Sequence, residues 1–293
     1  MNTRIIPRIV ALTFGLGLGI TSCATPHSSD RPTVVVTYSV LGDVVLQLVG
    51  DAADVQVIIP NGQDPHGFEP SAKNVETLNN AVLIVANGAQ LEEHLDHLID
   101  EAHRSGVPVF AMADHVSTRM MTEDGTAITD PHLWLDPMMI YQAIPDLARE
   151  LGAILNVDLT SRVTDMQQNL ADTSSEAMAI ISTIKNCTLV TGHDEMGYFA
   201  ARYGCTIIGA IIPSLSTSAE ATAGQIAELK NLVSIAGVGA IFTDFGTSTR
   251  VAKQLSQELN IQLVVLSTHT LETGDHYKEF ILRISQQIAD ALN

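Results

Sequence analysis

Two short stretches of the sequence each place a histidine in a proline-rich loop, and the second stretch nearly repeats the first. The first reads Asp64-Pro65-His66-Gly67-Phe68-Glu69-Pro70, and the second reads Asp130-Pro131-His132-Leu133-Trp134-Leu135-Asp136-Pro137. Proline fixes its own backbone φ and restricts the residue before it, so each histidine is expected on a stiff loop. Two stiff loops that each present one imidazole predict a shared metal ion, whereas the alternative is two ordinary turns with solvated histidines.

Acidic residues close to these histidines are candidates to orient the imidazole rings. A histidine that ligates a metal usually donates its other ring N–H to a carboxylate, a carbonyl or a water. We expect this role for five acids: Asp64, Glu69, Asp130, Asp136 and Asp194.

Two further histidines follow predicted strands in the second half of the chain. His193 comes at the end of the strand predicted over residues 187–191, where Gly192 permits a tight turn before a helix. The alternative is that His193 caps that helix or makes all its hydrogen bonds within the core. His269 follows the last predicted strand and is the favoured fourth ligand, with Asp244 as its rival. Either residue would complete a four-coordinate shell.

The elements that must position these residues alternate between strand and helix. Short β-branched or apolar runs predict four strands in the first half, at residues 33–37, 55–59, 82–86 and 107–112. Helices between the strands predict a parallel sheet with helices on its faces. Ligands of such sheets collect at the carboxyl ends of the strands, and both His66 and His132 follow strands.

The second half repeats the alternation, with strands predicted at residues 187–191, 206–210, 240–243 and 262–266. Residues 158–185 contain neither Gly nor Pro, which predicts one long helix of roughly 40 Å. Two shorter helices with a break near residues 173–175 are the alternative. We therefore predict an α/β fold of two lobes, residues 33–157 and 186–293, each a four-stranded parallel sheet flanked by helices, joined by one long rigid helix. Helices are also predicted at residues 91–104 and 217–235, and a polar loop at residues 114–130.

The N-terminal residues 1–22 have the pattern of a signal peptide. Two arginines precede an apolar run at residues 9–20, which is too short to span a membrane comfortably. The run ends in Ile20-Thr21-Ser22-Cys23, which resembles a bacterial lipobox. Cleavage before Cys23 would leave a lipid-modified cysteine, and ordinary cleavage without lipid is the alternative. Residues 23–32 are polar and read as a tether.

Composition excludes several classes of function. The chain has 293 residues and a net charge of -18, so nucleic acid is an unfavourable partner, because phosphate binding needs clustered Lys and Arg. No His-Glu-x-x-His, Gly-x-Ser-x-Gly or phosphate-loop motif is present. Export to an oxidising compartment would allow Cys187 and Cys205 to form a disulfide, since they lie at the starts of two predicted strands. Two buried free thiols are the alternative.

Three motifs together resemble the zinc/manganese-binding lipoproteins of bacterial ABC importers. They are Asn61-Gly62-x-Asp64-Pro65-His66-x-Phe68-Glu69-Pro70-Ser71, Asp130-Pro131-His132-x-Trp134-Leu135-Asp136-Pro137 and Gly192-His193-Asp194-x-x-Gly197-Tyr198-Phe199-Ala200-x-Arg202-Tyr203-Gly204. The resemblance implies two α/β lobes with a metal between them. It also implies that His66 and His132 ligate from the first lobe, and that His193 and a residue near His269 ligate from the second.

The sequence departs from this family in two places. The fourth ligand position of the family is commonly an Asp, where this chain carries His269, and the His-rich loop of zinc-binding members is reduced to His115. Manganese-type members tend to carry Glu where His193 stands. Imidazole-rich coordination suits zinc and carboxylate-rich coordination suits manganese, so Zn²⁺ is the expected cargo and Mn²⁺ is the second choice.

These observations predict a binding protein and not an enzyme. We expect a monomer, anchored by lipid on the outer face of the cytoplasmic membrane, that captures Zn²⁺ between two lobes and delivers it to an ABC importer permease. A Mn²⁺-specific protein of the same type is one alternative. A zinc-dependent hydrolase with Glu195 as general base is another, and a surface adhesin with a structural metal is a third.

Overall fold

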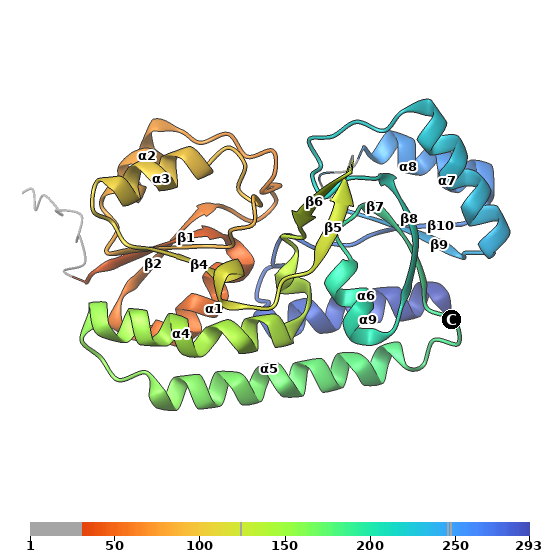
Figure 1. The fold of residues 1–293 in the computed structure, drawn as a ribbon. Helices are drawn as coiled ribbons and strands as arrows, with labels where there is room; N and C mark the ends of the chain where they lie inside the picture. The colour runs from red at the N-terminus through yellow and green to blue at the C-terminus, as the bar shows by residue number, and fades with distance from the viewer. Residues whose placement is uncertain (1–30, 124, 245, 247) are drawn as a thin grey trace, which may run out of the picture. The chain divides into compact units, whose positions relative to one another are not determined.

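The computed structural model describes residues 31–293 except residues 124, 245 and 247, and Arg31–Asn293 form one compact unit (Figure 1). The predicted signal peptide, the lipidation site Cys23 and most of the tether therefore lie outside the described residues. Among the residues that are described, no helix combines the length and the apolar character needed to cross a membrane.

The first sheet is built from four parallel strands in the order β2-β1-β3-β4. The strands are β1 (Thr33–Tyr38), β2 (Asp54–Ile59), β3 (Leu83–Ala86) and β4 (Val109–Ala111). The central strand is a β-branched run, and Val34, Val35 and Val36 are completely buried, as expected for a strand covered on both faces. The helices of this half are α1 (Ser39–Val49), α2 (Ala72–Asn79), α3 (Asp96–Arg104) and α4 (Pro137–Leu155), with short 3₁₀ turns η1 (Gly50–Ala52), η2 (Met112–His115) and η3 (Leu133–Leu135).

The second sheet repeats this arrangement with the strand order β10-β9-β7-β8, again all parallel. Its strands are β7 (Thr188–His193), β8 (Thr206–Ile212), β9 (Ala240–Thr243) and β10 (Gln262–Val265). Its helices are α6 (Gly197–Tyr203), α7 (Ala223–Ala236), α8 (Thr249–Leu259) and α9 (Tyr277–Leu292). The predicted fold class, two four-stranded parallel sheets flanked by helices, is confirmed.

One continuous helix, α5 (Thr160–Ile181), connects the two halves, without a break at residues 173–175. The Asp158 carboxylate accepts the backbone N–H of Thr160 at 2.9 Å, which satisfies a donor at the start of the helix. The helix packs against α1 and α4 of the first half and against α6 and α9 of the second (Figure 1).

The structure differs from the sequence-based expectations in three segments. The predicted polar loop at residues 114–130 contains an antiparallel hairpin of β5 (Met120–Glu123) and β6 (Thr126–Thr129). The available signal was the Asp-Gly pair between these strands, which favours a tight hairpin turn. Helix α7 begins at Ala223 and not at residue 217, because Thr222 and Gln225 form a capping box. Helix α3 begins at Asp96, five residues later than expected, after a series of turns.

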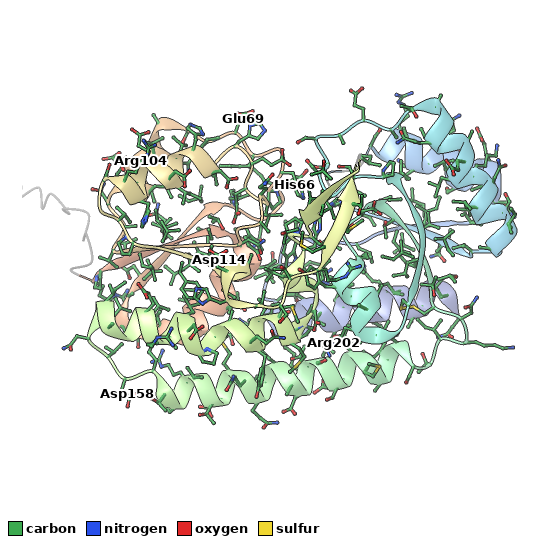
Figure 2. The ribbon with its side chains drawn as sticks, viewed as in Figure 1. His66, Glu69, Arg104, Asp114, Asp158 and Arg202 are labelled. Atoms are coloured by element: carbon green, nitrogen blue, oxygen red, sulfur yellow. A yellow bond between two sulfur atoms is a disulfide. The ribbon has the colours of Figure 1, made fainter. Side chains whose placement is uncertain are left out.

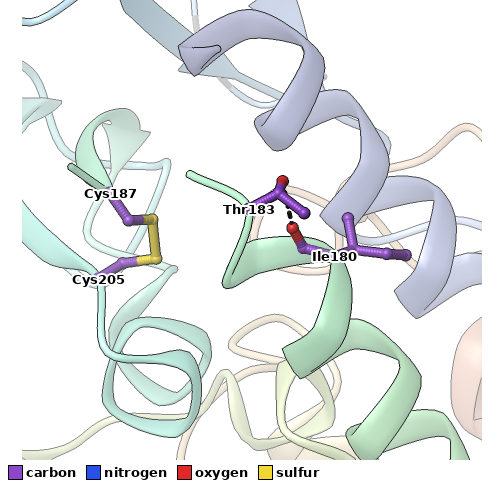
Figure 3. Close-up of a disulfide and its surroundings, with 4 residues drawn as sticks. All are labelled: Ile180, Thr183, Cys187 and Cys205. Carbon is purple, nitrogen blue, oxygen red and sulfur yellow. Dashed lines mark hydrogen bonds between the residues drawn. A yellow bond between two sulfur atoms is a disulfide. The ribbon is translucent and has the colours of Figure 1, made fainter. Parts of the chain in front are cut away.

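Cys187 and Cys205 are joined by a disulfide with a Cα–Cα distance of 4.7 Å. The two cysteines directly precede β7 and β8, which are neighbours in the second sheet, so the bond links the starts of two paired strands. Figure 3 shows this bond together with Thr183, which donates to the carbonyl of Ile180 at 2.7 Å at the end of α5.

Candidate metal site

Four buried histidines from the two halves of the chain meet at one point. His66 follows β2, His132 precedes η3, His193 is the last residue of β7 and His269 follows β10. Each offers a ring nitrogen within 4.8 Å of the others, and none is more than 2% exposed. His66 lies where the loop after β2 approaches the second half (Figure 2). The carboxyl edges of two separate sheets therefore supply one cluster, as the positions after strands predicted.

The ring nitrogens are spaced as ligands of a single ion would be. The Nε2 atom of His132 lies 3.3 Å from Nε2 of His66 and 3.2 Å from Nε2 of His193. Two nitrogens bound tetrahedrally to zinc at roughly 2.0–2.1 Å are separated by about 3.3–3.4 Å. The three imidazoles thus converge with the spacing of a metal shell.

Both candidates for the fourth ligand lie beside this cluster. The Nδ1 atom of His269 is 3.2 Å from Oδ2 of Asp244, and the His269 and His193 rings stack with centroids 5.6 Å apart. Nε2 of His269 has no hydrogen-bond partner among the described residues. Asp244 and Glu195 also join His193 and His269 in a second group of close ligand atoms.

Burial and neighbouring charges set the protonation of the rings. Burial holds the pKa of His132 and the pKa of His193 well below their usual value, so both rings are neutral, which is the form that ligates a metal. Burial also lowers the pKa of His269, but the Asp244 carboxylate more than offsets this and raises it to about 9. Burial, followed by the Asp244 charge, raises the pKa of Glu195 well above its usual value.

Asp130 holds the His132 backbone and ring in place. Its Oδ1 accepts both the His132 backbone N–H at 3.0 Å and Nδ1 of the ring at 2.9 Å, while its Oδ2 accepts from Arg119 at 2.8 Å. Burial raises the pKa of Asp130 to about 6, against the lowering effect of the His132 and Arg119 donors. A Cβ at Gly197 would collide with the Arg119 guanidinium, which explains why the third motif carries glycine there.

Three of the other predicted acids, Asp64, Glu69 and Asp136, contact groups other than the cluster rings. Asp64 accepts the backbone N–H of His66 at 3.1 Å and contacts Thr217 of the second half, so it holds the loop and not the ring. Asp194 is half-buried beside His193, and its backbone N–H donates to Ser214.

Glu69 and Asp136 require a correction, because each points away from the ring that it was expected to orient. Glu69 follows the buried Phe68 and is turned to the surface, where it contacts Nδ1 of His94 at 2.9 Å. Asp136 is the N-cap of α4, so its carboxylate is directed at the helix, where it accepts from the Met138 backbone at 2.9 Å. The same oxygen of Asp136 also accepts from Arg202.

Residues that the sequence reasoning missed lie after β3. Glu93 approaches Nδ1 of His66 at 3.4 Å, and this interaction lowers the pKa of Glu93. His66, Glu93, Pro131 and Ser216 line part of a cavity beside the cluster. The signal was positional, since the segment after β3 ends at the same sheet edge as the segments after β2 and β4.

The single tryptophan gives a direct probe of this site. The Trp134 ring centroid lies 5.4 Å from the ring centroids of both His132 and His269, and Trp134 is completely buried. Because a bound ion changes the charge and mobility of both imidazoles, we expect zinc to change the emission of Trp134 until about one ion per chain is bound. Fluorescence titration measures this, with Mg²⁺ as the control ion. Zinc binding without any change in emission would contradict the placement of Trp134 against the site.

The family model of zinc-uptake complex component A, periplasmic (ZnuA), matches residues 34–291. The chain belongs to the ZnuA family. It is therefore a metal-binding substrate-binding protein of ABC importers and not an enzyme, and the resemblance drawn from its three motifs is confirmed.

Relatives of this ZnuA-family chain are named for different metals. It is 28% identical to the manganese ABC transporter substrate-binding lipoprotein PsaA of Streptococcus pneumoniae, over 99% of this chain and 98% of that protein. It is 29% identical to the zinc-binding protein TroA of Treponema pallidum, over 81% and 79% of the two chains. The solved structure of periplasmic zinc-binding protein TroA from Treponema pallidum superposes with a TM-score of 0.81 at 23% identity, covering 89% of this chain and 99% of that one.

Proposed function

We propose that the cargo of this ZnuA-family protein is Zn²⁺ and that His66, His132, His193 and His269 ligate it. The observation that carries the proposal is the spacing of the three Nε2 atoms, at 3.2 and 3.3 Å, among buried rings. Neutral imidazoles are the ligating form, and the lowered pKa values of His132 and His193 supply it at neutral pH. The four protein ligands close the shell, which is typical of binding and not of catalysis.

The choice of zinc over manganese rests on the donor atoms. Nitrogen donors favour zinc over manganese, whereas carboxylate oxygens favour manganese. The names of the relatives support a transition metal without selecting one, since PsaA is named for manganese and TroA for zinc. Four imidazoles in one cluster therefore favour zinc in this chain.

Metal analysis of protein purified without a chelator tests the proposal. We expect about one zinc per chain, and we expect zinc to displace manganese when the two compete at equal concentration. Protein that holds several times more manganese than zinc under these conditions would overturn the choice of ion. Protein that binds neither ion would overturn the proposed cargo site itself.

We also propose that residues 1–22 are removed and that Cys23 carries the lipid that anchors a monomer outside the cytoplasmic membrane, with residues 23–32 as a tether. The lipobox-like Ile20-Thr21-Ser22-Cys23 supports the anchor, and the relative PsaA is named a lipoprotein. The periplasmic description of the family supports the extracytoplasmic location. The cargo would pass from there to the importer permease. Metabolic labelling with a fatty acid tests the anchor, because a Cys23→Ala protein should carry no label.

Zinc binding should release a proton near neutral pH. The pKa of His269 is raised to about 9, so this ring carries a proton at pH 7 in the metal-free protein and must lose it to ligate. Zinc affinity should therefore rise about tenfold per pH unit from about pH 7 to about pH 9, and then level off. Calorimetry in buffers of different ionisation enthalpy counts the released protons. His269→Ala is the control, and an unchanged proton count in that variant would contradict the assignment.

A further inference from the structure

A second group of ligand atoms overlaps the histidine cluster and adds two carboxylates to it. His193, Glu195, Asp244 and His269 each offer a ligand atom within 4.8 Å of the others, and none is more than 2% exposed. All four residues belong to the second half of the chain, at or after the ends of β7, β9 and β10. The group shares two imidazoles with the first cluster but replaces His66 and His132 by carboxylates.

The position of Glu195 in this group is not explained by a role in orienting the histidine rings. Asp244 lies 3.4 Å from Nδ1 of His193 and 3.2 Å from Nδ1 of His269, close enough to accept from either ring. Glu195, in contrast, is 4.0 Å from Nδ1 of His193 and 3.9 Å from Nε2 of His269, beyond hydrogen-bond distance. Glu195 therefore sits among the rings without holding them.

Two buried atoms of this group lack hydrogen-bond partners among the described residues, namely Glu195 Oε2 and His269 Nε2. Buried polar groups without partners are costly, so their presence together points to a ligand that satisfies them. The 3.9 Å between Glu195 Oε2 and His269 Nε2 is within the span of about 4.2 Å that two ligands of one ion at about 2.1 Å can reach. A cation placed between these two atoms would satisfy both.

We propose that His193, Glu195, Asp244 and His269 form a second metal position, which accepts the harder divalent cations Mn²⁺ and Fe²⁺. Two imidazoles with two carboxylates give a mixed nitrogen and oxygen shell, and this shell suits manganese better than four imidazoles do. When both carboxyl groups are ionised, their two negative charges also neutralise the ion in a buried site. Because the positions share His193 and His269, and because two adjacent dications repel, one ion occupies one position at a time.

This inference rests on the proposed function and refines it. The His66 and His132 imidazoles complete a zinc position, and the Glu195 and Asp244 carboxylates complete a manganese position in the same crevice. The chain would then carry more than one metal through alternative donor sets, and Glu195 would decide how well it holds manganese.

The test compares Zn²⁺ and Mn²⁺ affinities of the full-length protein and three variants by competition with a chromophoric chelator. Glu195→Gln keeps the size of the side chain and removes its charge, so it should weaken manganese binding at least about tenfold more than zinc binding. His132→Ala should show the reverse order. Glu92→Gln is the matched control, because Glu92 is equally buried but bonds to Thr37 and to the Asn87 backbone and belongs to neither group of ligand atoms. Its ratio of zinc to manganese affinity should equal that of the wild type.

The outcomes separate the two proposals. Wild-type protein that binds neither ion would refute the cargo site. If the wild type binds both ions and Glu195→Gln has the same ratio of zinc to manganese affinity as the wild type, only the second position is refuted. Anomalous scattering from wild-type crystals grown with manganese and with zinc needs no variant. Two distinct ion positions support the inference, and one common position overturns it.

Discussion

Replacing His132 with alanine is expected to weaken zinc binding by more than about 100-fold, because losses of groups that merely orient a ligand already cost up to that factor. His132 connects the other rings of the cluster, since its Nε2 atom lies within 3.3 Å of the Nε2 atoms of both His66 and His193. The substitution also leaves the buried carboxylate of Asp130 without its ring donor. Competition with a chelator of known zinc affinity measures the loss.

The control for this experiment is a histidine of the same half that lies outside the cluster. Nδ1 of His103 contacts the carbonyl of Val107 at 3.1 Å, at the end of α3, so His103→Ala should bind zinc as the wild type does. Circular dichroism of both variants checks that the fold is kept. Zinc affinity that is equal in His132→Ala and in the wild type would refute the site.

The second large effect concerns stability and not binding. The disulfide between Cys187 and Cys205 closes a loop with a sequence separation of 18 residues. The chain-entropy estimate for a loop of that length predicts that the Cys187→Ser, Cys205→Ser double variant loses about 3 kcal/mol of unfolding free energy. Denaturation with urea at neutral pH measures the difference.

Reduction provides the comparison for the double variant. Wild-type protein treated with a thiol reductant should unfold at the same urea concentration as the double variant, and the double variant should not respond to reductant. Wild-type protein whose unfolding midpoint is unaffected by complete reduction would show that the bond adds nothing to stability.

The strands, and the positions of the histidines after them, could be predicted from the sequence because the local pattern of apolar and β-branched residues determines them. Val34, Val35 and Val36 form a β-branched run that can be satisfied only in a buried strand. Once alternating strands and helices predict parallel sheets, residues that follow strands must gather at one edge of each sheet, which places His66 at the edge of the first sheet and His193 at the edge of the second.

The sequence could not predict which way each acidic side chain points, because that depends on the backbone conformation of its loop. Asp136 and Glu69 occupy equivalent places in two similar motifs, yet one caps a helix and the other reaches the surface. Glu93 and Glu195 approach the rings from segments that carry no repeated motif. Only the tertiary arrangement of the loops decides which carboxylate faces which imidazole.

The hydrogen bonds of Trp134 have a consequence for how an ion would leave. Its indole N–H donates to the carbonyl of Thr268 at 2.7 Å, and its own carbonyl accepts from Tyr277 at 2.7 Å. The loop that carries His132 is thereby fastened to the residue next to His269. Separation of the two halves would remove the ligands of both halves from the ion at the same time. Release of the ion should therefore occur in one step and not by the successive loss of single ligands.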